Sequence, residues 1–279
     1  MTRFDERLHA GAWQSLEISR ELFRGASEYQ SILVFENPLL GRVLVLDDVV
    51  QTTEADEFVY HEMLTHLPIL GHREVGDILI IGGGDGGMLE EALKHPLARV
   101  TVVELDVRVV EICREYLPSI CGAAFDDPRT DLIIGDGAVY AAETDRRFDL
   151  IIVDSPDPIG PAQILFEQSF YANCRRALRD DGLLVTQNGV PFFQSDEVRR
   201  TARAFANLFR NWGFYVAPVP AYYGGHMAFG WGRNGSDLAR SLDDSGRKRA
   251  AALDTRYYNS DVHQAAFALP AYIRDLIVS

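Results

Sequence analysis

Short apolar runs, separated by residues that favour turns, fill the amino-terminal part of the chain. Three of these runs are rich in β-branched or aliphatic residues and cover 31–36, 42–46 and 49–53. Asn37-Pro38 and Asp47-Asp48 separate them, and these residue types are common in tight turns. The pattern predicts an antiparallel β meander, followed by a helix over 54–67.

Beyond Gly76 the pattern changes to buried apolar strands that alternate with helices. Five strands are expected at 77–81, 99–103, 130–134, 148–153 and 182–187. Helices are expected at 88–95, 107–116, 169–178 and 196–209, and two further strands at 215–219 and 227–231. This alternation predicts a parallel, doubly wound α/β sheet of the Rossmann-like kind. We therefore expect an N-terminal β-strand domain over 1–54 and a Rossmann-like catalytic domain over 55–279.

The composition limits the kind of ligand. The chain has 279 residues, 47% hydrophobic and 24% charged, which suffices for a full core. Its formal net charge of -14 argues against nucleic-acid binding, which needs a basic surface. An acidic field attracts cations and therefore favours a cationic substrate, although acidity that only maintains solubility explains the charge equally well.

Cysteine usage and segment lengths indicate the compartment. Cys113, Cys121 and Cys174 form no CxxC pair, so we expect no disulfide framework and no metal site, and a cytoplasmic location. The first residues lack the apolar stretch of a signal peptide, and no window approaches 18 uninterrupted apolar residues. The sequence therefore predicts no association with a membrane.

A glycine-rich segment, Gly-Gly-Gly-Asp-Gly-Gly at 82–87, lies between a predicted strand and a predicted helix. Glycines allow a tight turn and a close approach of backbone to ligand. Glu104 ends the next strand about 20 residues further on, where a carboxylate accepts hydrogen bonds from ribose hydroxyls. Together they predict a nucleoside-binding site.

Asp85, inside the glycine segment, narrows the choice of nucleoside. A carboxylate here repels phosphate, which otherwise binds at the amino terminus of the following helix. It suits a nucleoside that carries an ammonium group and no carboxylate. The alternative is that Asp85 is an exposed helix cap.

Asp136-Gly137 follows the third strand of the α/β domain. The carboxylate of Asp136 can accept a hydrogen bond from an adenine amine, while Gly137 leaves room for the ring. The alternative is a plain turn. The neighbouring Glu104 and Asp85 favour the binding interpretation.

The fourth strand is followed by Asp154-Ser155-Pro156-Asp157-Pro158-Ile159-Gly160-Pro161. Two carboxylates, Asp154 and Asp157, lie three residues apart in a segment that its three prolines stiffen. An aliphatic amine is protonated at neutral pH and must lose a proton to attack. A carboxylate held against the ammonium can take that proton, so the segment predicts a general base.

Tyrosines at two places could wall a channel for a methylene chain with cationic ends. They are Tyr60, beside His61 in the predicted helix over 54–67, and Tyr222, beside Tyr223 in a late loop. From the residues alone, a packing role for each of these side chains is the stronger interpretation.

Taken together, these segments resemble the polyamine aminopropyltransferase family, in its bacterial spermidine synthase branch. The resemblance covers nearly the whole chain. Its most specific parts are the glycine segment and the double-Asp proline segment. Further matching segments are 29–36, 45–54, 56–63, 104–106, 187–190, 222–225, 256–259 and 263–267.

The resemblance implies a Rossmann-like, methyltransferase-type catalytic domain, a cytoplasmic homodimer or homotetramer, and no prosthetic group or metal. Decarboxylated S-adenosylmethionine would be the co-substrate and putrescine the aminopropyl acceptor, with Asp154 as proton acceptor. It further implies contacts to the nucleoside from Gln30, Asp85, Glu104, Asp136, Gly137 and Pro161. Contacts to the diamine are implied for Tyr60, His61, Asp154, Asp157 and Tyr222.

The sequence departs from the family pattern in places, and rival functions stay open. Asp48 stands where the family often has glycine, and Ala221 where it often has threonine. Ala221 bears on the choice of acceptor, which could instead be cadaverine, agmatine or spermidine. The other rivals are an S-adenosylmethionine-dependent methyltransferase and a non-catalytic polyamine-binding protein, since fold alone does not determine function.

Overall fold

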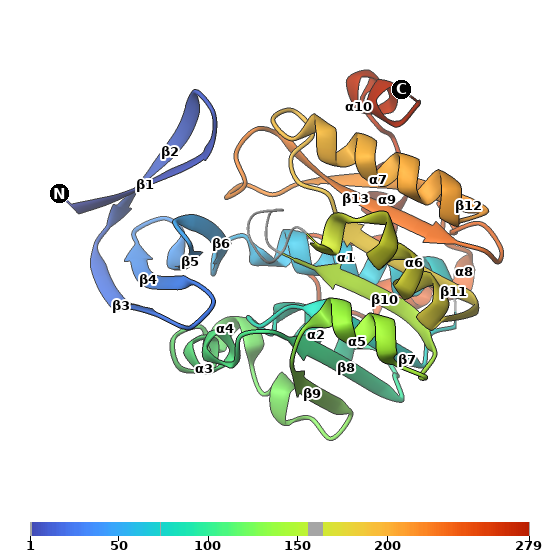
Figure 1. Ribbon diagram of the computed structural model, residues 1–279, viewed down its shortest axis with the longest axis horizontal. Coiled ribbons are helices and arrows are strands. Elements are labelled where there is room, and N and C mark those ends of the chain that lie inside the picture. The colour runs from blue at the N-terminus through green and yellow to red at the C-terminus, as the bar shows by residue number, and fades with distance from the viewer. Residues whose placement is uncertain (1, 73, 156–163, 279) are drawn as a thin grey trace.

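The computed structural model describes residues 2–72, 74–155 and 164–278. Its amino-terminal part is all β (Figure 1). A hairpin of β1 (Thr2–His9) and β2 (Ala12–Ile18) precedes a four-stranded sheet. That sheet contains β3 (Arg20–Ala26), β4 (Ser31–Asn37), β5 (Gly41–Leu46) and β6 (Val49–Thr53). All its pairings are antiparallel, which confirms the predicted meander.

The turn between β5 and β6 has an unusual backbone. Asp47 and Asp48 have φ of 46° and 61°, in the left-handed region that favours glycine. Because Leu46 pairs with Val49, these two residues form the whole loop, and such a hairpin requires positive φ at both positions. The backbone of Asp48 is therefore strained in this turn, whereas glycine would adopt the same φ without strain.

The second part of the chain forms a seven-stranded sheet in the order β12-β13-β11-β10-β7-β8-β9. Its strands are β7 (Asp77–Gly82), β8 (Arg99–Glu104), β9 (Thr130–Ile134), β10 (Phe148–Asp154), β11 (Leu178–Gln187), β12 (Asn211–Pro218) and β13 (His226–Arg233). The first five are parallel. The expectation of a parallel sheet is wrong only for β13, which pairs antiparallel with both of its neighbours, β11 and β12, and which a short connection joins to β12 without a crossover helix.

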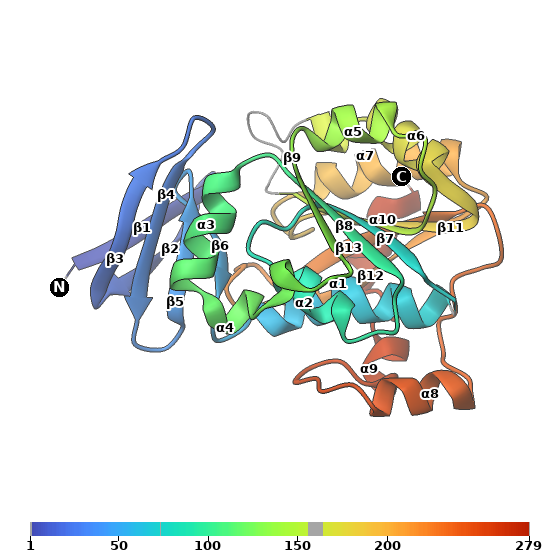
Figure 2. The ribbon, with the colours of Figure 1, turned by 90° about the horizontal axis from the view of Figure 1, so that it is seen from below.

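Helices cover both faces of this sheet (Figures 1 and 2). The α-helices of the described residues are α1 (Glu57–His72), α2 (Gly87–Leu93), α3 (Val107–Tyr116), α4 (Pro118–Cys121), α5 (Gly137–Glu143), α6 (Gln168–Ala177), α7 (Ser195–Leu208), α8 (Asp244–Ala251), α9 (Ser260–Ala265) and α10 (Ala271–Val278). Ile78 and Ile80 of β7 pack under α1 and α2, whereas Leu79 and Ile81 pack under α5, α6 and α7. The doubly wound α/β class is confirmed.

Some element bounds differ from the prediction. The first helix begins at Glu57, not at residue 54, because 54–56 form a turn in which Thr53 donates to Asp56 over 2.6 Å. It continues past Pro68 to His72. The sequence pattern did not predict β1, β2, β3 or the short helices α4, α5, α8, α9 and α10.

Helix α3 lies between the two sheets (Figure 2). Val109, Ile112 and Cys113 on α3 pack in one buried cluster with Val34 of β4 and Leu44 of β5. This cluster fixes the amino-terminal sheet against the strand ends of the larger one. The site described below has walls from both.

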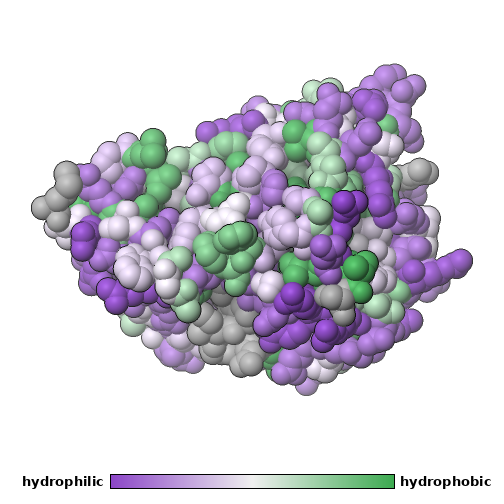
Figure 3. Space-filling view, turned by 90° about the horizontal axis from the view of Figure 1, so that it is seen from above, coloured by the Kyte–Doolittle hydropathy of each residue, from purple (hydrophilic) through white to green (hydrophobic). Residues whose placement is uncertain are grey.

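Hydrophilic residues predominate on the face shown in Figure 3, where the hydrophobic ones form small separate groups. All three cysteines are buried as free thiols. Within 2–72, 74–155 and 164–278, no helix combines the length and apolar character needed to cross a membrane.

Candidate active site

A cavity of about 320 Å³ opens where the carboxyl ends of the parallel strands meet the amino-terminal sheet. The end of β10 pairs with the end of β7, with Asp154 opposite Gly82, and β8 lies on the other side of β7. The chain leaves β7 and β10 toward opposite sides of the sheet. Such a switch point is where open α/β sheets bind their ligands.

Close backbone approach explains the first glycine of the 82–87 segment. Gly82 has φ of 85°, and a Cβ built on it would lie 1.9 Å from the backbone oxygen of Asp154. Any other residue would push β10 away from β7. Gly82 therefore determines where the Asp154 side chain lies.

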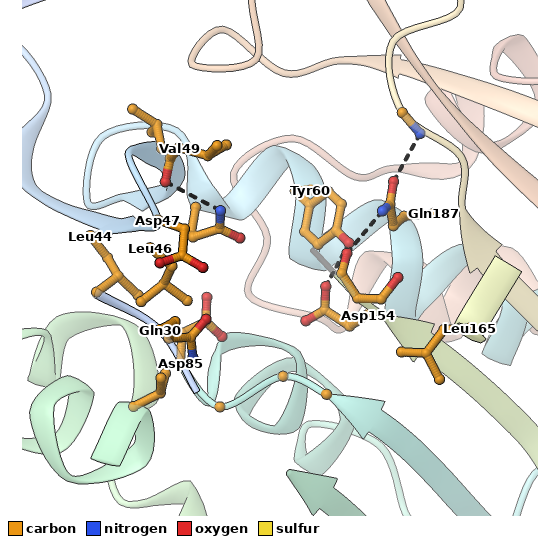
Figure 4. A pocket seen from close by; sticks show the side chains of 18 of the residues that line it. Gln30, Leu44, Leu46, Asp47, Val49, Tyr60, Asp85, Asp154, Leu165 and Gln187 are labelled. Atoms are coloured by element: carbon orange, nitrogen blue, oxygen red, sulfur yellow. Dashed lines mark hydrogen bonds between the residues drawn. The ribbon is translucent and has the colours of Figure 1, made fainter. Parts of the chain in front are cut away.

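Asp154 is the central acid of the cavity. The hydroxyl of Tyr60, on α1, donates to its Oδ1 over 2.6 Å, and Figure 4 shows the two side chains facing one another. Burial, followed by the nearby Asp85 carboxylate, raises the pKa of Asp154 to about 6. A carboxylate with such a pKa is ionised at neutral pH yet basic enough to accept a proton.

Asp85 and His61 form an ion pair beside Asp154. His61 Nε2 lies 3.3 Å from Asp85 Oδ2, and Nδ1 lies 2.7 Å from Glu57 Oε2. Burial alone would lower the pKa of His61, but the adjoining carboxylates of Asp85 and Glu57 outweigh it and raise the pKa well above its ordinary value. Burial would raise the pKa of Asp85, but the charge of His61 lowers it.

The cluster of His61, Asp85 and Asp154 therefore suits an ammonium ligand. One ligand atom from each lies within 4.8 Å of the others, a spacing that a metal ion could also use. A protonated imidazole has no lone pair for a metal, whereas carboxylates can accept hydrogen bonds from an ammonium group. The alternative of a helix cap holds in part for Asp85. Its side chain accepts a hydrogen bond from the backbone N–H of Gly87, at the start of α2, but it also faces the cavity.

Glu104 lies over the glycine segment, as the spacing predicted. Its Oε2 is 2.9 Å from the position of a Cβ on Gly84, and its Oε1 accepts from the backbone N–H of Asp106 over 2.9 Å. Burial raises the pKa of Glu104 to about 7, although hydrogen bonds from the backbone N–H groups of Asp106 and Gly84 oppose the shift. The group is thus balanced between acid and base forms near neutral pH.

Gln30, Asp136 and Gly137 also line the cavity. The Gln30 amide donates to Asp106 over 2.8 Å, which brings β4 and the β8 end together. Asp136 caps α5 by accepting from the backbone N–H of Ala138 over 2.7 Å, so a structural role exists beside any binding role. A Cβ on Gly137 would lie 2.3 Å from Ile81, so glycine here is required for packing as well as for space.

Aromatic side chains also line the cavity, among them Tyr60 and Tyr222. The rings of Tyr60 and Tyr222 meet edge to face with centroids 5.9 Å apart. The Tyr222 hydroxyl donates to the backbone oxygen of Gln51. Two of the predicted site residues, Asp157 and Pro161, lie outside the described residues.

Several lining residues were not predicted from the sequence. Glu6 and His9 reach the cavity from β1, Asp47 from the β5–β6 turn, and Gln187 from the end of β11. Gln187 is the last residue of the strand predicted at 182–187, so its position at a carboxyl end was an available signal. Glu6 and His9 carried none, because only the tertiary fold brings β1 to the cavity.

Ala221 does not line the cavity. Its side chain packs in the amino-terminal cluster with Phe4 and Val50. Its backbone N–H donates to Asp56 over 2.5 Å. No contact of the Ala221 side chain with the cavity therefore supports the expected influence of Ala221 on the choice of acceptor.

The geometry defines a Rossmann-like protein with an anionic, aromatic-walled ligand site at its switch point. A family model described as spermine/spermidine synthase domain matches residues 57–240, and one described as spermidine synthase tetramerisation domain matches residues 3–54. The chain belongs to the spermine/spermidine synthase family, a family of polyamine aminopropyltransferases.

Curated relatives and solved structures agree over the whole chain. Polyamine aminopropyltransferase 1 of Pseudomonas aeruginosa is 51% identical over 99% of this chain and 98% of its own length. The polyamine aminopropyltransferase of a Ruegeria species is 53% identical over 97% of this chain and 96% of its own length.

A spermidine synthase crystallised with the transition-state analogue AdoDATO is 35% identical, with a TM-score of 0.94 over 99% of this chain and 95% of that one. The Thermotoga maritima spermidine synthase is 34% identical, with a TM-score of 0.91 over 99% and 94%.

Proposed function

We propose that this aminopropyltransferase is a spermidine synthase. It would transfer the aminopropyl group of decarboxylated S-adenosylmethionine to putrescine and release 5'-methylthioadenosine. The observation that carries the proposal is Asp154, a carboxylate with a pKa of about 6, placed between a nucleoside-type loop and two tyrosines.

The nucleoside would occupy the side of the cavity formed by the glycine segment. Glu104 would accept from the ribose hydroxyls, and Asp136 would accept from the adenine amine. Gln30, Gly137 and Pro161 would complete the contacts. A related spermidine synthase was crystallised with AdoDATO, a transition-state analogue, which supports a decarboxylated S-adenosylmethionine site here.

The two ammonium groups would bind the acidic cluster. Asp85 would hold the amine of the aminopropyl group beside His61, while Asp154 and Asp157 would hold the reacting end of putrescine. Tyr60 and Tyr222 would wall the channel for its four-carbon chain. The edge-to-face rings support this assignment, because they face the cavity from α1 and from the loop before β13.

The reaction would be a direct displacement. Asp154 takes a proton from the putrescine ammonium, and the freed lone pair attacks the aminopropyl carbon bonded to the sulfonium sulfur. As the N–C bond forms, the C–S bond breaks and its electron pair stays on sulfur in methylthioadenosine. Sulfonium is a good leaving group, so the protein mainly supplies orientation and a base.

Residues 1–54 and 55–279 would act as separate domains in a homodimer or homotetramer. The description of the family model over 3–54 supports assembly, as do exposed apolar residues in that region, where Trp13 is 61% and Leu39 84% exposed. The buried free thiols support a reducing compartment, the cytoplasm. Light scattering on the purified protein measures the assembly.

A product assay tests the proposed function. The purified protein is incubated with decarboxylated S-adenosylmethionine and, in separate reactions, putrescine, cadaverine, agmatine or spermidine, and the products are identified by mass. We expect spermidine as the fastest product. A faster reaction with another amine would show that this amine, and not putrescine, is the acceptor. Transfer of a methyl group in a parallel reaction with S-adenosylmethionine would support the methyltransferase instead. Binding without any product would indicate a non-catalytic polyamine-binding protein.

A further inference from the structure

Glu57 is an acidic residue near the cavity to which neither the sequence pattern nor the proposed reaction assigns a task. It opens α1, four residues before His61, and its Oε2 lies 2.7 Å from His61 Nδ1. The other ring nitrogen, Nε2, faces Asp85 Oδ2 at 3.3 Å. An imidazole can donate from both nitrogens only when it is protonated. The two carboxylates therefore select the cationic ring.

The surroundings leave the His61 ring little freedom. Its side chain is 2% exposed, and that of Glu57 is 14% exposed. A Cβ on Gly87 would lie 2.3 Å from the ring, so α2 packs directly on it. The Tyr60 ring contacts it edge on, with centroids 5.5 Å apart. Packing fixes the plane of the ring, and Glu57 supplies the hydrogen-bond partner for Nδ1.

We propose that Glu57 is a positioning residue for the aminopropyl transfer. It holds the proton on His61 Nδ1, which directs the Nε2 proton at Asp85 and keeps a positive charge beside Asp85 and Asp154. Both acids then meet the incoming ammonium groups as anions. The catalytic part of this inference rests on the proposed function, whereas the charge on His61 does not.

The charge balance of the cavity makes this role necessary. Neither lysine nor arginine lines the cavity within the described part of the chain, so the His61 cation is the principal partner for its acids. Besides Glu57, the titratable groups that interact with His61 or contact its ring are Asp56, Tyr60, Asp85, Glu91 and Asp154. Because His61 lowers the pKa of Asp154, a neutral His61 would make Asp154 harder to ionise.

The test compares Glu57→Gln with Glu111→Gln, which removes the same charge from an exposed pair with Arg108 on α3. Glutamine at 57 can still accept from Nδ1 but no longer stabilises the cation. We expect His61 to lose its proton at lower pH in Glu57→Gln, and the acid limb of kcat/KM to move to higher pH. Near pH 6 the loss should be about tenfold, and it should shrink as the pH rises. Glu111→Gln should match the wild type.

Nitrogen NMR of the imidazole, assigned by the signal missing in His61→Asn, reads the charge without any substrate. In the wild type His61 should still be doubly protonated at about pH 8, where a free imidazole is neutral. A neutral wild-type His61 at that pH would overturn the proposal, even if no variant folds. So would a Glu57→Gln profile that falls by one constant factor at every pH, since a purely structural role predicts that result. Failure of the product assay alone would leave the NMR result standing.

Discussion

At the scale of single residues, the site depends on carboxyl groups whose burial makes them more basic than usual. Asp154 and Glu104 are shifted to pKa values of about 6 and about 7, while Asp85 is kept acidic by His61. Three acids in one cavity thus have three different proton affinities. This separation allows one to act as a base while another remains an anion that binds a cation.

If Glu104 accepts from the ribose as proposed, nucleoside binding must depend on pH. Its folded pKa is raised to about 7, so in the free protein it is increasingly protonated below that value. A ribose hydroxyl needs the carboxylate as acceptor, and binding below pH 7 must therefore release a proton. We expect the Kd for 5'-methylthioadenosine to rise about tenfold from pH 8 to pH 6. Calorimetry at several pH values measures it.

The control for this prediction is Glu104→Gln, which cannot titrate. Its binding should be weaker than that of the wild type at pH 8 and independent of pH over the same range. A wild-type Kd that stays constant from pH 8 to pH 6 would contradict the assigned role.

Residue-level prediction from the sequence was uneven for physical reasons. Glu104 and Asp85 were predicted because strand ends and glycine turns are local patterns. The protonation state of His61 was not predicted, because a packing role was the stronger interpretation from the sequence. The charge of His61 depends on Asp85, which only the fold brings near. The packing task of Gly137 against Ile81 was equally invisible in the sequence.

At the scale of elements, the strand ends and the turns that follow them place the chemistry. Alternating strands and helices predicted that the carboxyl ends would gather, and β7, β8 and β10 do meet at the cavity. The contribution of β1 could not be predicted, because its charged residues hide the strand pattern and its contacts are distant in sequence. The antiparallel β12–β13 pair was missed because the apolar pattern does not encode strand direction.

Gly82→Ala tests how tightly β7 and β10 must pack. The new methyl group would meet the Asp154 backbone oxygen and displace Asp154 from Tyr60. We expect kcat/KM to fall by about 100-fold or more, since a shift of about 1 Å has that effect. Gly135→Ala, where nothing lies within 4 Å, is the matched control and should stay near wild type. Equal activity of the two variants would contradict this packing argument.

The β5–β6 turn offers a stabilising change. Asp48→Gly removes a side chain from a residue at φ 61°, which should stabilise the fold by about 1 kcal/mol. The melting temperature should rise by about 2–4 °C. Asp47→Gly should gain less, because Asp47 accepts two hydrogen bonds from Ser31. A lower melting temperature for Asp48→Gly would show that the turn gains nothing from glycine.

At the scale of the whole molecule, an amino-terminal sheet closes an α/β site that carries excess negative charge. The buried cluster around α3 holds the two sheets together, so Gln30 and Asp47 can face Asp85 and Asp154 across one cavity (Figure 4). The net charge of -14 was consistent with a cationic substrate and equally with acidity that only maintains solubility. It could not predict that the acids converge, since solubility alone would scatter them.

The net charge predicts a salt dependence that separates the two ligands. Added salt screens the attraction between an acidic protein and a dication. We expect the KM for putrescine to rise severalfold between roughly 0.05 and 0.5 M salt, while the Kd for neutral methylthioadenosine stays constant. Steady-state rates and calorimetry in the same buffers provide the comparison. A parallel change in both constants would point to a general effect of salt on the fold.

The rate of methylthioadenosine formation by Asp154→Asn, at saturating co-substrate and putrescine, tests most directly whether Asp154 removes the proton. Asparagine keeps the shape of the side chain but cannot accept the proton. We expect kcat to fall by about 10²–10⁴-fold and the Kd for methylthioadenosine to stay nearly unchanged. A kcat within a few-fold of wild type would contradict proton removal by Asp154.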